Sequence, residues 1–245
     1  MVIGVPTVRR QGARYLECTL RSIFDNITMV EISQILVVVM IAEIDDQYIK
    51  HISNEIQTKF STQINSGVLE VIAPPKSFYP NFDTLQPNLG DNTDRIIWRT
   101  KQVLDYVFLI MYASKRSSAY YLQLEDDVLV IEDHFITTIK NVAEKLSIEN
   151  SNWFMINFSE LGFIGKFFKV TDLPTLVMYF VMFYKNNPVD LLLYDIVTAK
   201  ACSSGMSLED CSKEKLKIEH HHTPSLFYHI GSTSSLSGKV QSTGT

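Results

Sequence analysis

Short apolar segments alternate with segments of helical periodicity through most of the chain, and this alternation restricts the fold more than any other feature. The apolar segments, which read as buried strands, cover residues 2–5, 35–41, 68–72, 120–125 and 153–158. Between them, apolar residues recur at helical spacing, as in Leu16, Leu20 and Ile23. Strands that alternate with helices form a mainly parallel sheet covered by helices. The sequence therefore predicts an α/β fold.

Polar residues follow the predicted core strands, at positions 6–10, 43–46, 125–127 and 159–165. In α/β sheets, ligands bind beyond the carboxyl ends of the strands. We therefore expect these four segments to form one polar rim, and we expect the binding site to lie on it.

The acidic run Glu125, Asp126 and Asp127 directly follows an apolar strand that includes Tyr120. Three adjacent carboxylates repel one another and resist burial, so a fold that places them at the end of a core strand usually offsets their charge with a cation. A divalent metal that carries a diphosphate would supply that charge. The alternative is a solvated acidic turn, because acidic residues are common at strand ends.

Length and composition exclude several classes of protein. The 245 residues fit one large domain or two small ones, and the hydrophobic share of 46% is enough for a sizeable core. A net charge of -5 without a long basic run argues against a nucleic-acid partner. The longest apolar segments, 35–42 and 176–184, are far shorter than the roughly 18 residues that span a bilayer. We therefore expect no membrane span in this chain.

The chain begins abruptly at an apolar segment, residues 1–6, which has no basic leader and reads as a core strand. We therefore expect a fragment or a trimmed form of a longer protein. Residues 241–245 are small and polar, as expected of a frayed end.

Three cysteines are present: Cys18, Cys202 and Cys211. Cys202 and Cys211 lie in a hydrophilic section, 198–222, that we expect to be loosely structured. A disulfide between them would close a short loop if the compartment is oxidising. Cys18 lies in an amphipathic segment beside Leu16 and Leu20, which predicts a buried free thiol.

Five segments, in their order along the chain, together resemble one protein family. No single segment would be specific enough by itself. They cover residues 2–10, 98–102, 122–127, 161–166 and 224–227. In this order and spacing the chain resembles the alpha-1,3-mannosyl-glycoprotein 4-beta-N-acetylglucosaminyltransferases, the N-acetylglucosaminyltransferase IV family. The similarity extends from residue 2 to about residue 239.

The resemblance implies one GT-A-type catalytic domain over residues 1–245, with a nucleotide-sugar half at about 1–130 and an acceptor half at about 131–240. It implies an inverting transfer of N-acetylglucosamine from UDP-N-acetylglucosamine to a mannose of an N-glycan core on glycoproteins, with Mn²⁺ or Mg²⁺ as cofactor. A Golgi lumen setting is also implied, with association with other Golgi glycosyltransferases as a further possibility. The resemblance also implies a membrane anchor and a C-terminal carbohydrate-binding domain in longer members, for which we expect no counterpart within these residues.

For the metal, the resemblance points to Asp127 as a direct ligand, with Asp126 beside it and Glu125 turned toward the ribose. Strand alternation places Glu125 and Asp127 on the same side. His229 is either a second metal or diphosphate contact, as in many GT-A enzymes, or a simple turn residue. Residues 220–222, three consecutive histidines, read as a solvated surface run, because neighbours on a strand point in opposite directions.

An inverting transfer needs a general base for the acceptor hydroxyl. Asp190 is the leading candidate because its segment resembles the aspartate segment of related N-acetylglucosaminyltransferases, although Leu191 stands where the family has tryptophan. The alternative role of Asp190 is a helix N-cap. Glu160 is the alternative base; the nearest family pattern has glutamine there and glutamate at the position of Asn157.

The nucleotide-sugar side draws on residues that follow the first two strands. Thr7, Arg9 and Arg10 are candidates for holding uracil and phosphate through charge-assisted bonds. Glu43 and Asp45 are candidates for accepting from the uracil N3–H. Two cations at the start of the helix before the acidic run, Arg99 and Lys101, are candidates for balancing the diphosphate charge. The alternative for the charged residues among these is that each is an ordinary solvent-exposed charge on the polar rim.

Two functions of different classes stay open at this point. One is an active glycosyltransferase, which the intact acidic run favours. The other is a catalytically silent relative that binds and regulates other N-glycan-processing glycosyltransferases, which the departures at Asn157 and Leu191 leave open. A nucleotide-binding α/β protein of another kind is disfavoured because the chain has no glycine-rich phosphate-binding motif.

Overall fold

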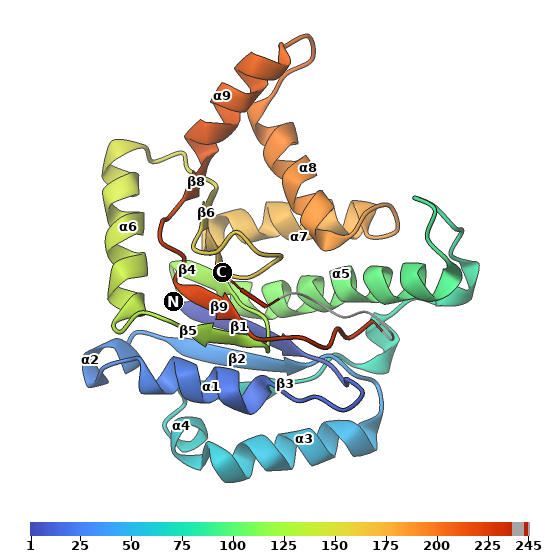
Figure 1. The fold of residues 1–245 in the computed structure, drawn as a ribbon, viewed down its shortest axis with the longest axis vertical. Coiled ribbons are helices and arrows are strands. Elements are labelled where there is room, and N and C mark those ends of the chain that lie inside the picture. Colours follow the sequence, from blue (N-terminus) through green and yellow to red (C-terminus); the bar gives the residue numbers. More distant parts are fainter. Residues whose placement is uncertain (237–242, 245) are drawn as a thin grey trace.

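A computed structural model describes residues 1–236 and 243–244, and it shows a central sheet with helices on both faces (Figure 1). The seven strands of the sheet follow the order β3-β2-β1-β4-β7-β6-β8. Their bounds are β1 Val2–Thr7, β2 Leu36–Ile41, β3 Leu69–Ile72, β4 Tyr120–Gln123, β6 Met155–Asn157, β7 Lys166–Lys169 and β8 Glu219–His221. Two further strands, β5 Val128–Val130 and β9 Phe227–His229, form a separate antiparallel pair.

One strand of the sheet, β7, runs opposite to the other six. Strands β3, β2, β1 and β4 are parallel, β7 is antiparallel to both β4 and β6, and β8 is parallel to β6. The predicted α/β fold with a mainly parallel central sheet flanked by helices is therefore confirmed. The sequence did not predict β7, β5, β8 or β9 as strands.

Two apolar layers lie on opposite faces of the sheet. Along β2, Val37 and Val39 belong to one layer, and Val38 and Met40 belong to the other. Because successive side chains of a strand point to opposite faces, a continuous apolar run is the pattern expected of a strand buried on both sides.

The first layer is formed with α1 Leu16–Asp25, α3 Asp46–Lys59 and α6 Phe135–Glu149. The second is formed with α5 Thr93–Ser114, α7 Leu173–Phe183 and α8 Val189–Ala201. Three further helices are α2 Met29–Ile32, α4 Ser61–Asn65 and α9 Leu208–Ile218, and short 3₁₀ turns occur at Lys76–Phe78, Phe82–Thr84 and Val170–Asp172. Among the described residues, none of the helices has both the length and the apolar character that crossing a bilayer requires.

Side-chain caps fix where several helices begin. Asp45 accepts hydrogen bonds from the backbone N–H groups of Gln47 (3.0 Å) and Tyr48 (3.2 Å) at the start of α3. Asn92 accepts from Arg95 N at the start of α5, and Ser207 accepts from Asp210 N at the start of α9. Each cap satisfies an amide group that the first helical turn leaves without an intrahelical partner.

Two sequence-based expectations about the cysteines need correction. Cys18 is exposed and not buried, because its position on α1 faces away from the core residues Leu20 and Ile23. The section 198–222 is not loose: it contains the end of α8, all of α9 and β8. Cys202 and Cys211 form a disulfide that joins these two helices, which project together from the body (Figure 1). Residues 237–240 of the predicted acceptor half, and 241, 242 and 245 of the predicted frayed end, lie outside the described residues.

Candidate active site

The sequence had suggested that the acidic run continues a strand. The structure places it in a turn between two strands instead. Strand β4 ends at Gln123, and β5 begins at Val128. Within the turn, Asp126 is directed to one set of partners and Glu125 and Asp127 to another. Glu125 and Asp127 therefore point to the same side and Asp126 to another, as predicted, but the turn and not strand alternation produces this arrangement.

Asp126 is held by the last residue of β1 and by a residue of the loop that follows it. It accepts hydrogen bonds from Thr7 Oγ1 at 2.5 Å and from both terminal nitrogens of Arg10 at 2.7 and 2.6 Å. Arg10 also lies 3.2 Å from Asp127 Oδ2. Both side chains of the Arg10–Asp126 pair are almost fully buried, so each charge offsets part of the desolvation cost of the other. The structure thus brings the predicted residues Thr7 and Arg10 onto the acidic run.

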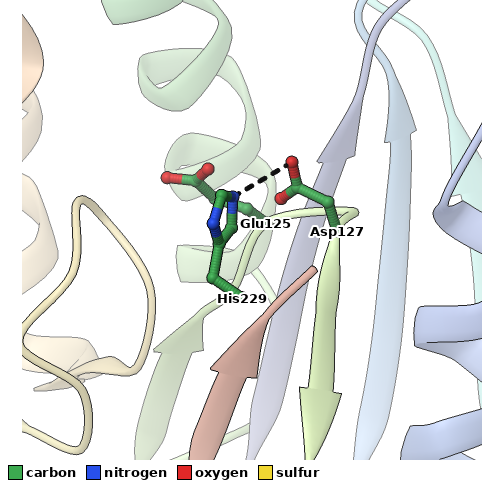
Figure 2. Close-up of side chains that lie close together, drawn as sticks. All are labelled: Glu125, Asp127 and His229. Atoms are coloured by element: carbon green, nitrogen blue, oxygen red, sulfur yellow. Dashed lines mark ion pairs between the residues drawn. The ribbon is translucent and has the colours of Figure 1, made fainter. Parts of the chain in front are cut away.

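Glu125, Asp127 and His229 form a second cluster (Figure 2). Their candidate ligand atoms all lie within 4.8 Å of one another, and His229 Nε2 is 3.3 Å from Asp127 Oδ2. The antiparallel pairing of Val128 with His229 brings the histidine to this position from just over one hundred residues away in the chain. Glu125 therefore lies with Asp127 and His229. The expectation from the sequence was that Glu125 faces the ribose of the nucleotide.

The electrostatics of this cluster favour a cation. Burial, together with the charges of Asp127 and Asp190, raises the pKa of Glu125. Asp127 is 1% exposed, and its Oδ1 atom is buried without a hydrogen-bond partner among the described residues. A buried carboxylate oxygen without a partner carries a desolvation cost that a bound metal ion would remove. Two carboxylates and one imidazole are a donor set that fits Mn²⁺ or Mg²⁺.

Gly231, in the segment after β9, closes the cluster. A Cβ atom at this position would lie 2.0 Å from Asp127 Oδ2 and 2.9 Å from His229 Nε2. Only glycine leaves the room that these two side chains occupy. The backbone N–H of Ile230 donates to Asp127 O at 2.9 Å, which fixes this segment against the acidic turn.

The predicted rim residues after β1 and β2 also meet. Arg9 N donates to Glu43 Oε1 at 2.8 Å, and the Arg9 guanidinium forms an ion pair with Asp45 Oδ2 at 2.7 Å. The guanidinium lies over the ring of Tyr48, 4.1 Å from its centroid. Nearby, a cavity of about 160 Å³ opens between α1 and α3, with Thr7, Arg10, Tyr15, Tyr48 and Asp126 in its lining.

The two cations predicted on α5 are engaged in structural contacts. Arg99 is 0% exposed; it donates to Asn186 O at 2.9 Å and to Asn88 Oδ1, and it pairs with Asp91 at 3.1 Å. These bonds fasten the loop before α5 to the segment after α7. Lys101 donates to Ala42 O at 2.7 Å and to Asp105 at 2.8 Å. The structure therefore gives Arg99 a buried anchoring role, and not the rim position that the sequence analysis assumed.

The two candidate bases differ in their surroundings. Asp190 is exposed in the first turn of α8, one residue after the first helical position, so it is not the N-cap, which is Pro188. Its charge reaches the cluster, because it contributes to the raised pKa values of Glu125 and Tyr106. Glu160 is exposed, and its Oε1 atom lies 2.8 Å from Nδ1 of His221, within hydrogen-bond distance.

The three histidines were expected to be a solvated run, and only part of that expectation holds. His220 and His221 lie on β8, the edge strand, and are paired with Ile156 and Asn157. His221 is exposed, whereas the Nε2 atom of His220 is buried without a hydrogen-bond partner among the described residues. The two side chains point to opposite faces of the sheet.

Comparison with known proteins now adds to this geometry. A family model for the MGAT4 conserved region matches residues 1–244. The chain belongs to this family.

Two curated relatives illustrate the similarity within the MGAT4 conserved region family. "Alpha-1,3-mannosyl-glycoprotein 4-beta-N-acetylglucosaminyltransferase A" from Pongo abelii is 44% identical over 98% of this chain and 44% of its own length. The B enzyme of that name from Homo sapiens is 43% identical over 98% of this chain and 43% of its own length. The chain thus spans less than half the length of the curated relatives it matches.

Among solved structures, "Crystal structure of S. aureus TarS" aligns with a TM-score of 0.46 at 12% identity, over 94% of this chain and 36% of that one.

Two buried side chains near the cluster, Tyr106 and Lys166, were not among the residues predicted from the sequence. Tyr106, on α5, is buried with its ring edge-on to Phe163 at 4.6 Å. Burial and the charges of Glu125 and Asp190 raise its pKa, so its hydroxyl stays protonated. Lys166 is a buried lysine at the start of β7. Tyr106 lies within an apolar helical stripe that gives no functional signal, whereas Lys166 ends one of the segments that carried the resemblance.

Proposed function

We propose that this chain is a GT-A-type transferase domain that moves N-acetylglucosamine from UDP-N-acetylglucosamine to a mannose of an N-glycan core, with inversion, to form a β1,4 branch. Membership of the MGAT4 conserved region family and the activity in the names of the curated relatives support this proposal. The observation that carries it is the cluster of Glu125, Asp127 and His229, with its unpartnered carboxylate oxygen, at the carboxyl end of β4.

Asp127, Glu125 and His229 would hold the metal ion, Mn²⁺ or Mg²⁺. When bound, the ion stabilises the negative charge that develops on the diphosphate leaving group. The chain contributes a rigid site: Asp126 is locked by Arg10 and Thr7, so the turn that carries Glu125 and Asp127 is fixed before any ligand arrives.

The nucleotide side is proposed to lie along the rim after β1 and β2. Arg9, Glu43 and Asp45 already contact one another there and offer both donors and acceptors for a uracil base. Arg10 adds a positive charge beside the acidic cluster, where a diphosphate would need one. Tyr48 supplies an aromatic surface within the same rim.

Asp190 is proposed as the general base. Its carboxylate takes the proton from the acceptor hydroxyl while the hydroxyl oxygen attacks the anomeric carbon and the bond to UDP breaks. A single displacement of this kind inverts the configuration at that carbon. Asp190 suits the role better than Glu160 because its charge acts on Glu125 of the cluster, whereas Glu160 is engaged with His221.

We further propose that the domain works in the Golgi lumen on N-glycans of glycoproteins. The disulfide between Cys202 and Cys211 supports a lumenal setting, because disulfides persist in oxidising compartments. Association with other Golgi glycosyltransferases belongs to the same proposal.

The test is a transfer assay on the full chain. It is incubated with Mn²⁺ and UDP-N-acetylglucosamine, with and without a biantennary N-glycan, and UDP release is measured together with the NMR structure of the product. We expect UDP release to be faster with acceptor and a new β1,4 linkage on mannose. UDP binding without any product would overturn the transferase and leave the regulatory relative. Faster release with a product of α configuration would overturn the inverting mechanism alone.

A further inference from the structure

The pairing of four strands places one row of polar side chains on the same face of the sheet. Gln123 at the end of β4 pairs with Lys166, Lys166 pairs with Asn157, and Asn157 pairs with His221. Residues directly opposite each other on adjacent strands project to the same face. We call Gln123, Lys166, Asn157 and His221 the polar row.

The face on which the polar row projects is set by its neighbours along each strand. Leu122, Phe167 and Ile156 belong to the apolar layer with α1, α3 and α6. The polar row therefore projects to the other face, where α5, α7 and α8 pack. Asp190 lies at the beginning of α8, on this same side of the sheet.

The middle of the polar row is buried but incompletely satisfied. Lys166 is 6% exposed and donates to Ser159 O at 2.7 Å. Asn157 is 2% exposed; its Nδ2 donates to Glu219 Oε1 at 3.0 Å, while its Oδ1 has no hydrogen-bond partner among the described residues. Buried amide oxygens are nearly always paired, so this atom is a candidate for satisfaction by a ligand or by water that a ligand orders.

The outer end of the polar row is an exposed rim. His221 is paired through Nδ1 with Glu160 at 2.8 Å, and its Nε2 lies 3.4 Å from Asn157 Nδ2 and 3.7 Å from Glu219 Oε1. The side chains of His221 and Glu160 are 41% and 65% exposed. The rim therefore presents hydrogen-bonding groups to solvent directly above a buried polar floor.

The charge balance around Lys166 indicates what kind of ligand fits. Burial lowers the pKa of Lys166, and the carboxylates of Glu160, Asp190, Glu219 and Glu125 act against that effect. Leaving out Glu125, which belongs to the metal cluster, one ammonium group among the three remaining carboxylates still leaves the region negative overall, which disfavours a phosphate or another anion. Mixed donors and acceptors without a large apolar wall suit the hydroxyl groups of an uncharged sugar.

We propose that Glu160, His221, Asn157 and Lys166 form the subsite for the acceptor sugar, a neutral hexose with adjacent hydroxyl groups. Glu160 and His221 contact the sugar, and Asn157 and Lys166 support them from below. The polar row runs from the end of β4, which leads into the metal cluster, to the edge strand β8, and Asp190 lies at the start of α8 on the same face, so a sugar bound there would have a hydroxyl on the side of the proposed base. The inference rests on the proposed transferase function for the identity of the acceptor, but the subsite is a separate set of residues.

The test uses the double variant E160Q/H221Q, which keeps side-chain size while changing charge and hydrogen bonding at exposed positions. The matched control is the double variant H51Q/E144Q, which makes the same changes at exposed positions of α3 and α6. Two quantities are measured: the KM values for biantennary N-glycan and for UDP-N-acetylglucosamine, and glycan binding without donor by saturation-transfer difference NMR.

We expect E160Q/H221Q to raise the acceptor KM about tenfold, as for the loss of one or two hydrogen bonds, with the donor KM changed less than about twofold. The control leaves both KM values unchanged. An unchanged acceptor KM in E160Q/H221Q, or an equal rise in both KM values, overturns the subsite.

The NMR experiment separates this inference from the proposed function. If the wild-type chain transfers no sugar but its glycan signals are lost in E160Q/H221Q, the subsite stands and the transferase proposal fails. If the wild-type chain transfers sugar and the double variant behaves as the control does, the transferase proposal stands and the subsite fails. Absence of glycan signals with the wild-type chain overturns the subsite as well.

Discussion

At the end of the sheet that carries the site, two groups of strands pair their buried polar groups in different ways. Next to β1 and β4, Asp126 and Arg10 neutralise each other at contact distance. Next to β6 and β7, Lys166 has a backbone carbonyl as its hydrogen-bond partner, and the Oδ1 atom of Asn157 lacks one among the described residues. The difference teaches that the first group has its charges paired without a ligand, which suits the proposed donor and metal site, whereas the second leaves a buried oxygen for the uncharged ligand that we propose.

The largest effect that tests this comparison is expected at the metal cluster. Replacing Asp127 by asparagine keeps the side-chain shape but removes the charge that faces His229. We expect kcat/KM for transfer to fall at least about a hundredfold, as when a main charge-stabilising group is lost. Mn²⁺ binding, followed by electron paramagnetic resonance of the free ion, should be lost in parallel. D133N, at an exposed acid of the same region, is the control. Full Mn²⁺ affinity in D127N would show that the cluster does not hold the metal.

The second prediction concerns the buried pair. R10M leaves Asp126 with its charge buried and its main partner gone, and we expect the free energy of unfolding to fall by about 3 kcal/mol. R14M removes the exposed pair with Glu55 and should cost less than about 1 kcal/mol. Urea denaturation of both variants measures the difference. Equal losses would mean that burial does not distinguish the two ion pairs.

A third prediction uses Glu31 as a reference carboxylate outside the site, one whose two oxygens are both engaged. Its side chain accepts hydrogen bonds from the backbone and hydroxyl groups of Thr28 and Thr137, at 2.6 to 3.0 Å. Burial opposes ionisation of Glu31, but these hydrogen bonds outweigh it and lower its pKa to about 2.

Because the pKa of Glu31 is lower in the folded state than its ordinary 4.5, its contribution to stability is complete above pH 4.5. That contribution is lost as the pH falls from 4.5 towards 2. E31Q should cost about 2 kcal/mol at neutral pH and flatten this acid dependence. Urea midpoints between pH 7 and pH 3 measure both effects. An acid dependence in E31Q as steep as in wild type would contradict the assignment.

The smallest effect is expected at Lys166. K166M removes a buried ammonium group, which relieves its desolvation, and loses the bond to Ser159 O. These two changes oppose each other, so we expect the free energy of unfolding to change by less than about 1 kcal/mol. K213M, on the exposed face of α9, is the control in urea denaturation. A loss as large as that of R10M would mean that Lys166 is as firmly paired as Arg10, and the comparison between the two groups of strands would fail.

The parallel part of the fold was predictable because its signals are local. Strands β1 and β2 are buried on both faces, which gives continuous apolar runs, and Asp45 marks the start of α3. Strand β7 was missed because Lys166 and Lys169 bound its two phenylalanines and hide a buried strand. Helix α9 was missed because it is polar on most positions and contains no buried residue.

The residue pattern pointed to site candidates only where they follow a predicted core strand, as the acidic run and Thr7 do. His229 was named through the family resemblance, because its approach to Asp127 depends on the pairing of β5 with β9, which spacing along the chain does not show. Arg99 was misplaced because an arginine at the start of a helix is usually exposed. Its burial depends on Asp91 and Asn186, from two loops that the sequence does not show to be adjacent.

Gly231 has a consequence for sorting the many sequences that share this domain. Its missing side chain is what lets Asp127 and His229 approach each other, since even one methyl group would overlap the carboxylate. A homologue with any other residue here must shift Asp127 or His229, or rebuild the segment after β9. If the proposed metal role holds, the residue at this single position should therefore distinguish homologues that keep the cluster from those that have lost it, before any protein is purified.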